Sequence, residues 1–221
     1  MLGVFCLRGG HGTRPEPIRV AGMGVLCAYV TPGGPREGRR LARAEKRLRR
    51  AGVSRILPCR GSGPDCSLPA VGTLPLCRAM ADRLVMSALA RRAILPQQAT
   101  VVLRGEYPDG DLAEAAYRLC PRVRQVVIET VRGGEELQHR LYREFGASVD
   151  PAAAEESVLR VRFSGSPAGE GVRLCTQSDV ADVRLEAPGV ELPDFLEPAP
   201  ALCALWQAGR LSLEQVRVQN T

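Results

Sequence analysis

Residues 99–149 decide the fold class of this chain, and they read ATVVLRGEYPDGDLAEAAYRLCPRVRQVVIETVRGGEELQHRLYREFGASV. The stretch contains two short apolar runs, at 100–103 and 126–128, that are typical of strands buried on both faces of a parallel sheet. Between them, apolar residues recur at the spacing of one helix face: Leu112, Ala115, Ala116 and Leu119. The order of strand, helix and strand predicts a βαβ unit of an α/β fold.

The same pattern starts again after the second run. Gly133 and Gly134 open another helix, in which Leu137, Leu141 and Phe145 recur every four residues. Gly146 suits the position just after the end of a helix, because glycine adopts a left-handed conformation easily. We therefore predict the order β-α-β-α over 99–149, with residues 147–149 as a candidate for a further strand.

This layout resembles half of a Rossmann-type nucleotide-binding domain. In that family ligands bind outside the carboxyl ends of the strands, phosphates meet a glycine turn at a helix N-terminus, and an acidic residue further along binds ribose. The resemblance assigns Gly105 and Gly110 to the turn, Glu129 to the acid and Gly133 to the lining of the crevice. It implies a small nucleotide-like ligand at the ends of the two strands.

The loop after the first strand departs from the family pattern. The motif G-x-G-x-x-G is absent, and Glu106, Asp109 and Asp111 stand where phosphate oxygens would need hydrogen-bond donors. A second interpretation therefore stays open, in which the acidic loop only caps a helix of a structural scaffold.

A long helical pattern begins at Pro75, with Leu76, Met80, Leu84 and Ala88 on one side. A long helix before the first strand of a nucleotide-binding unit also resembles the element order of two-domain dehydrogenases of the shikimate dehydrogenase type. That resemblance is one of element order and carries no catalytic residue across.

The N-terminal part of the chain predicts strands at 2–7, 24–30 and 54–58, with a helix at 36–50 before the last of them. We interpret the glycine-rich residues 8–13 as a turn and not as a phosphate site, because Pro15 and Pro17 follow in place of a helix.

The C-terminal part predicts short strands at 158–163, 172–175 and 180–185, a helix at 199–208 and a last strand at 215–218. The alternation of apolar and polar residues at 158–163 favours an antiparallel addition to the parallel sheet. The predicted fold is thus an α/β, Rossmann-like, mostly parallel sheet flanked by helices. Its predicted parts are 1–70, 71–150 and 151–221, the last belonging to the same sheet or to a small subdomain.

The net charge of the helix at 36–50 equals that of the whole chain. The helix contains eight Arg or Lys residues and two Glu residues, for a net charge of +6, and the whole chain, with 30 basic and 24 acidic residues, is also +6. Binding to a phosphate backbone needs such a local basic patch. Arg39, Arg40, Arg43 and Arg47 are the candidate polyanion-binding residues, and a merely solvated helix face is the alternative.

The remaining composition offers no catalytic or metal-binding pattern. The chain has two histidines, His11 and His139, in a glycine loop and on a polar helix side, and its eight cysteines have no spacing typical of zinc. Aromatic residues make up 4% of the chain, which disfavours stacking on bases. Without a secretory signal pattern or an 18-residue apolar run, we expect a cytoplasmic protein with reduced thiols that does not bind a membrane.

Two functions stay open on the sequence, beside a third possibility, a degenerate enzyme fold kept as a structural subunit. The first is binding of a small nucleotide-like ligand through Gly105, Gly110, Glu129 and Gly133. The second is a non-catalytic interaction of the basic helix with nucleic acid or an acidic protein. Whether the protein is an enzyme is left open, because hydride transfer with a nicotinamide cofactor needs no protein nucleophile.

Overall fold

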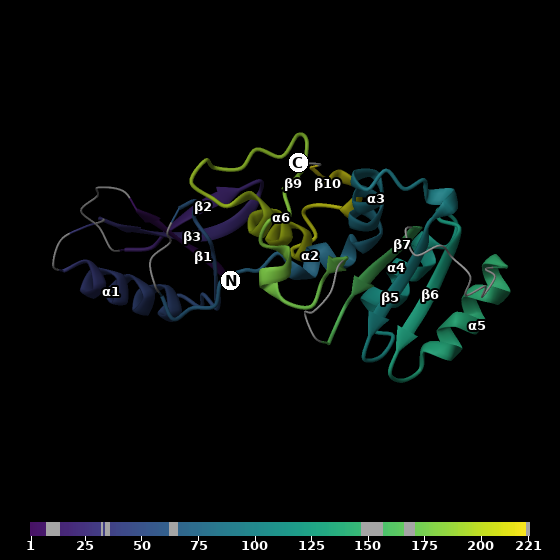
Figure 1. Ribbon diagram of the computed structural model, residues 1–221. Coiled ribbons are helices and arrows are strands. Elements are labelled where there is room, and N and C mark those ends of the chain that lie inside the picture. Colours follow the sequence, from purple (N-terminus) through teal and green to yellow (C-terminus); the bar gives the residue numbers. More distant parts are fainter. Residues whose placement is uncertain are drawn as a thin grey trace. The chain divides into compact units, whose positions relative to one another are not determined.

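The chain forms two compact units, each built around its own four-stranded sheet (Figure 1). The first unit comprises residues 1–72 and 185–217, and the second comprises residues 73–184 and 218–221. The computed structural model describes residues 1–7, 14–31, 33, 36–61, 66–146, 157–165 and 171–219. The predicted α/β class is confirmed, while the turn predicted at 8–13 and the strand predicted at 147–149 lie outside the described residues.

The sheet of the first unit has the strand order β2-β3-β1-β4: β1 (Leu2–Leu7), β2 (Glu16–Val20), β3 (Met23–Val30) and β4 (Arg55–Leu57). The strands β3, β1 and β4 are parallel, as a βαβ crossover through α1 (Glu37–Arg50) requires. The edge strand β2 pairs with β3 in the antiparallel direction. Sequence reasoning missed β2 because of Pro17, but an edge strand tolerates proline, whose missing N–H would face solvent.

The helix α1 covers one face of this sheet. Its buried residues Leu41, Ala44 and Leu48 pack in one apolar cluster with Phe5 and Ala28 of the strands. The helix α6 (Pro198–Gln207) contacts β4, and β9 (Leu185–Glu186) pairs with β10 (Arg217–Val218) in a separate two-stranded antiparallel sheet. The charged residues of α1 lie away from the buried stripe of Leu41, Ala44 and Leu48.

The sheet of the second unit is parallel throughout, with the strand order β6-β5-β7-β8: β5 (Thr100–Gly105), β6 (Gln125–Thr130), β7 (Val158–Arg162) and β8 (Val172–Arg173). The helix α4 (Gly110–Leu119) joins β5 to β6, and α5 (Gly134–Phe145) follows β6. The predicted order β-α-β-α is confirmed. Gly146 takes the left-handed conformation expected after α5, with φ at +65°.

The long helix predicted from Pro75 is interrupted. It consists of α2 (Leu74–Ala79) and α3 (Ala81–Arg91), which meet at Met80, where φ is −107° and ψ is 21°. Both helices pack against α4, and α3 also runs along β7 and β8. Short 3-10 helices connect the other elements: η1 (Pro96–Gln98), η3 (Gln177–Val180) and η4 (Leu213–Gln215).

Two predictions for the C-terminal part were wrong in detail. The strand at 158–163 pairs with β5 in the parallel direction, because the chain returns to the sheet along the same direction after α5. The segment 180–185 is mostly irregular, since η3 ends at Val180 and only Leu185 of this segment enters β9. The antiparallel part of the fold is instead the small sheet of β9 and β10.

Candidate functional site

The carboxyl ends of β5, β6 and β7 lie at one edge of the second sheet, where sequence reasoning placed a ligand crevice. The loops after β5 and β6 are joined by two backbone hydrogen bonds, from Val131 N to the Gly105 carbonyl (3.4 Å) and from Arg132 N to the Glu106 carbonyl (3.1 Å). The structure thus brings the loops containing Gly105 and Gly133 together. Gly110 is the first residue of α4, and Glu129 is an exposed residue of β6.

Local packing accounts for two of the three predicted glycines. A Cβ atom on Gly105 would lie 3.1 Å from the Leu112 side chain and 3.3 Å from the Tyr107 carbonyl oxygen. Gly133 precedes α5 with φ at +71°, a conformation that side chains disfavour. Around Gly110 there is open space for a side chain. Gly105 and Gly133 therefore have structural reasons to be present without any ligand, whereas the packing gives no such reason for Gly110.

Two acidic residues at this edge, Glu129 and Asp109, are engaged by groups of the same unit. The carboxylate of Glu129 forms an ion pair with Arg104 of the adjacent strand, and both side chains are about half exposed. Asp109 caps α4 by accepting a hydrogen bond from Leu112 N at 2.9 Å. The helix-capping interpretation of the acidic loop is therefore correct for Asp109.

The strand order reverses between β5 and β7, because β6 and β7 lie on opposite sides of β5. In doubly wound sheets ligands bind at such a reversal. Sequence reasoning placed the crevice between β5 and β6, because the pairing of β7 with β5 depends on a long-range contact. At the reversal itself, the Ser164 hydroxyl accepts a hydrogen bond from Glu106 N at 2.6 Å and so joins the ends of β5 and β7.

Arg78 of α2 also contacts residues at this reversal of strand order. Its guanidinium donates hydrogen bonds to the carbonyls of Phe163 and Leu174, the latter at 3.1 Å, and its charge centre lies 5.6 Å from the Phe163 ring centroid. It also pairs with Asp109 and Asp111 at 3.5 and 3.6 Å. A single arginine in an otherwise apolar short helix was the sequence signal that could have found it.

The electrostatics of Asp111 follow from this pairing. Burial raises the pKa of the Asp111 carboxyl, Arg78 opposes that rise, and the neighbouring Asp109 charge adds to it, so that the pKa lies above its ordinary value. The cluster of Arg78, Asp109 and Asp111 thus sets one positive group against two carboxyl groups. It leaves little unpaired positive charge for a phosphate group.

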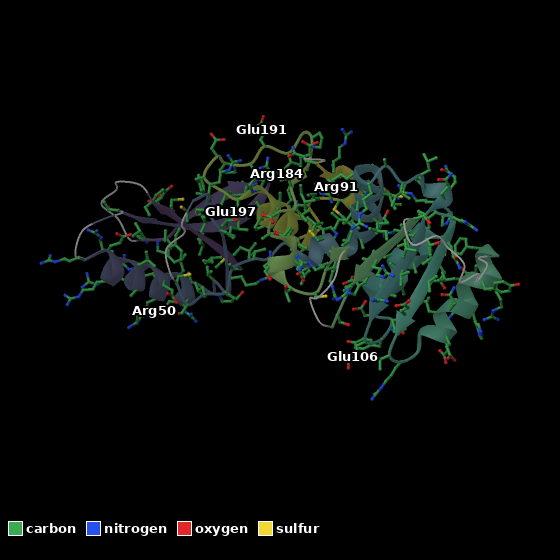
Figure 2. All side chains as sticks on the ribbon, in the orientation of Figure 1. Arg50, Arg91, Glu106, Arg184, Glu191 and Glu197 are labelled. Carbon is green, nitrogen blue, oxygen red and sulfur yellow. The ribbon has the colours of Figure 1, made fainter. Side chains whose placement is uncertain are left out.

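The second candidate site, on α1, is an uninterrupted row of basic side chains. We call this row the basic ridge. Its residues follow one another at the spacing of one helix face: Arg36, Arg39, Arg40, Arg43, Lys46, Arg47 and Arg50. All of them are exposed except Arg40, which is half-buried and donates a hydrogen bond to the Gly33 carbonyl at 2.6 Å. Figure 2 shows Arg50 at one end of α1. The predicted residues Arg39, Arg40, Arg43 and Arg47 therefore share one face.

The carboxylates of α1 lie on its flanks and are engaged there. Glu37 accepts a hydrogen bond from Gly33 N at 2.6 Å, and Glu45 binds Ser67 and forms an ion pair with Arg49 at 2.9 Å. Hydrogen bonding from Ser67 holds the pKa of Glu45 below its ordinary value despite partial burial, so Glu45 stays ionised beside Arg49. Within the described part of the chain, Arg39, Arg43 and Lys46 form no ion pair.

The other predicted candidates have simple outcomes. His139 is exposed on α5, and His11 lies outside the described residues. Among the residues that the structure describes, no three His, Cys, Asp or Glu side chains are grouped as a metal site would require, and no helix is long and apolar enough to cross a membrane.

The comparisons with known proteins identify no family: no protein-family model matches this chain, and the search of curated proteins found no match.

Proposed function

We propose that this protein binds nucleic acid through the basic ridge of α1, by contacts to the phosphate backbone. The observation that carries the proposal is the row of seven basic side chains on one helix face, with the carboxylates of the helix engaged at its flanks. A helix of 14 residues is about 21 Å long at 1.5 Å per residue, enough to follow several phosphates. Aligned positive charge of this kind gives sequence-independent affinity.

Nucleic acid fits the ridge better than an acidic protein does. Protein interfaces have a desolvated core rich in aromatic and other large apolar side chains. The exposed side of α1 offers only Gly38 and Ala42 beside its charges. A phosphate backbone needs no such apolar core, because its binding is driven by counterion release.

The test is a titration of a fluorescently labelled DNA duplex, read by anisotropy at low salt. The variant R39Q/R43Q/R47Q should lose most of the affinity, and the same loss is expected for every duplex sequence. The matched control R132Q/R140Q/R143Q removes the same charge from α5 and its preceding loop, where all three residues are exposed. Equal loss in both variants would show that net charge alone matters and would refute a site on α1.

A small-ligand function of the second unit is the second candidate, and the reversal of strand order between β5 and β7 supports it. In this Rossmann-like hypothesis, the ligand would bind near Arg78 and Ser164 and not between the ends of β5 and β6. Against it stand the internal contacts that both residues make. A panel of nicotinamide and adenine nucleotides at millimolar concentration should raise the melting temperature if it is correct, and the absence of any shift would exclude it.

A further inference from the structure

The second unit contains a pocket of about 430 Å3 that none of the functions above uses. It lies between α3 and the strands β7 and β8, with η3 at one side. Its floor is apolar, because Leu84 and Ala88 of α3 face Leu159 and Leu174 there, and each of these four residues is buried. A volume of this size falls within the range of about 300–1,000 Å3 that is usual for small-molecule sites.

The polar groups of the pocket are mostly arginines. Arg91 and Arg92 come from the end of α3, and Arg173 comes from β8, while Asp179 of η3 is the one carboxylate among the lining residues that the structure describes. Figure 2 shows Arg91 at the end of α3. Neither Arg91 nor Arg92 has a side-chain hydrogen bond or ion pair to any residue that the structure describes.

The carboxylate of Asp179 is already engaged. One of its oxygens accepts hydrogen bonds from Thr176 N at 2.8 Å and from Cys175 N at 3.2 Å, and the other lies 3.6 Å from Arg173 Nε. Burial would raise the pKa of Asp179, but the hydrogen bonds from Thr176 and Cys175 and the charge of Arg173 lower it below its ordinary value. Asp179 thus balances Arg173 and leaves the charges of Arg91 and Arg92 beside a pocket whose floor is apolar.

We propose that this pocket binds a small amphipathic carboxylate, with its apolar body on the floor and its carboxylate between Arg91 and Arg92. The guanidinium fork matches a carboxylate in two hydrogen bonds, and an apolar floor rewards burial of hydrocarbon. A neutral molecule would leave the arginines without a partner, and a simple inorganic anion would leave the floor uncovered. This site is in the second unit, so it does not depend on the proposed function of α1.

The experiment is an NMR titration of the full chain with octanoate, with 1-octanol and acetate as reference ligands. Octanoate at millimolar concentration should shift the methyl resonances of Leu84 and Val172, both of which line the pocket, and should bind more tightly than either reference ligand. The proposal is overturned if octanoate leaves these resonances unmoved, or if 1-octanol binds equally well.

Two variants test where the carboxylate and the hydrocarbon chain of octanoate bind. R91Q/R92Q should weaken octanoate binding about tenfold or more, the effect of losing a charge-assisted hydrogen bond, and should leave 1-octanol binding unchanged. The control R140Q/R143Q removes the same charge from exposed positions of α5 and should bind octanoate normally. Ala88→Phe should abolish binding by filling the floor. Normal octanoate binding by folded R91Q/R92Q would overturn the proposal without reference to Ala88→Phe.

Discussion

The substitution Arg78→Met tests whether the reversal of strand order is occupied by a structural side chain. Arg78 donates two hydrogen bonds to backbone carbonyls and pairs with two carboxylates, and its side chain is only 23% exposed. A hydrogen bond from a charged donor contributes about 1.5 kcal/mol at the lower end, and the part-exposed ion pairs add less than about 1 kcal/mol together. Methionine keeps most of the apolar stem. We therefore expect the free energy of unfolding to fall by about 3–4 kcal/mol.

The assay is urea unfolding followed by far-UV circular dichroism at pH 7. Arg104→Met is the matched control, because Arg104 forms a single ion pair among the described residues, with Glu129, and the two side chains are 36% and 45% exposed. It should cost less than about 1 kcal/mol. If Arg78→Met were as stable as the natural protein or more stable, Arg78 would be a group held at a cost for ligand binding, and the structural interpretation of the strand ends would be refuted.

Three further predictions concern the core, one carboxylate and two thiols. Leu48→Ala should lower the free energy of unfolding by about 3 kcal/mol, because Leu48 is fully buried between α1 and the sheet, and an unchanged urea midpoint would contradict that packing. Because the folded pKa of Asp179 lies below its unfolded value, its contribution to stability is present above that unfolded value and is lost as pH falls through the folded pKa. Asp179→Asn should therefore be less stable than the natural protein at pH 7, with the difference shrinking at strongly acidic pH, and a constant difference between the two urea midpoints would argue against this. Burial raises the pKa of Cys59 and of Cys120 to about 11, so both thiols should react slowly with iodoacetamide at pH 8 until urea is added, as peptide mass spectrometry would show.

The local elements of the fold could be predicted where the period of apolar residues is long and regular. The helix face of Leu112, Ala115, Ala116 and Leu119 is buried as expected, and Gly146 takes its predicted left-handed conformation. The break at Met80 could not be predicted, since neither proline nor glycine marks it. The turn between β2 and β3 was also missed, because Ala21 and not asparagine takes the first position with positive φ, at 44°.

The arrangement of elements depends on contacts that no local pattern encodes. The segment at 158–163 alternates as an antiparallel strand does, yet it pairs with β5 in parallel, and only the fold reveals this. The same holds for the candidate site at the strand ends. Gly105 and Glu129 could be proposed from the sequence, but the contact of Gly105 with the Leu112 side chain and the ion pair of Glu129 with Arg104 appear only in the folded structure.

The position of the basic side chains on α1 follows from the sequence, while their binding function stays a proposal. A helical period places the arginines on one face, and the charge of that face needs no knowledge of the rest of the fold. What the structure adds is the position of the buried stripe of Leu41, Ala44 and Leu48 and the engagement of Glu37 and Glu45 away from the ridge.

The most direct test of the ridge is the dependence of duplex binding on salt. The logarithm of the binding constant of the natural protein should fall linearly with the logarithm of KCl concentration, with a slope of about −5 if most of the ridge contacts phosphates. The variant R39Q/R43Q/R47Q should reduce that slope by about 3, while R132Q/R140Q/R143Q should leave it unchanged. Binding of the natural protein that is absent or independent of salt, or a slope that R39Q/R43Q/R47Q leaves unchanged, would contradict the account.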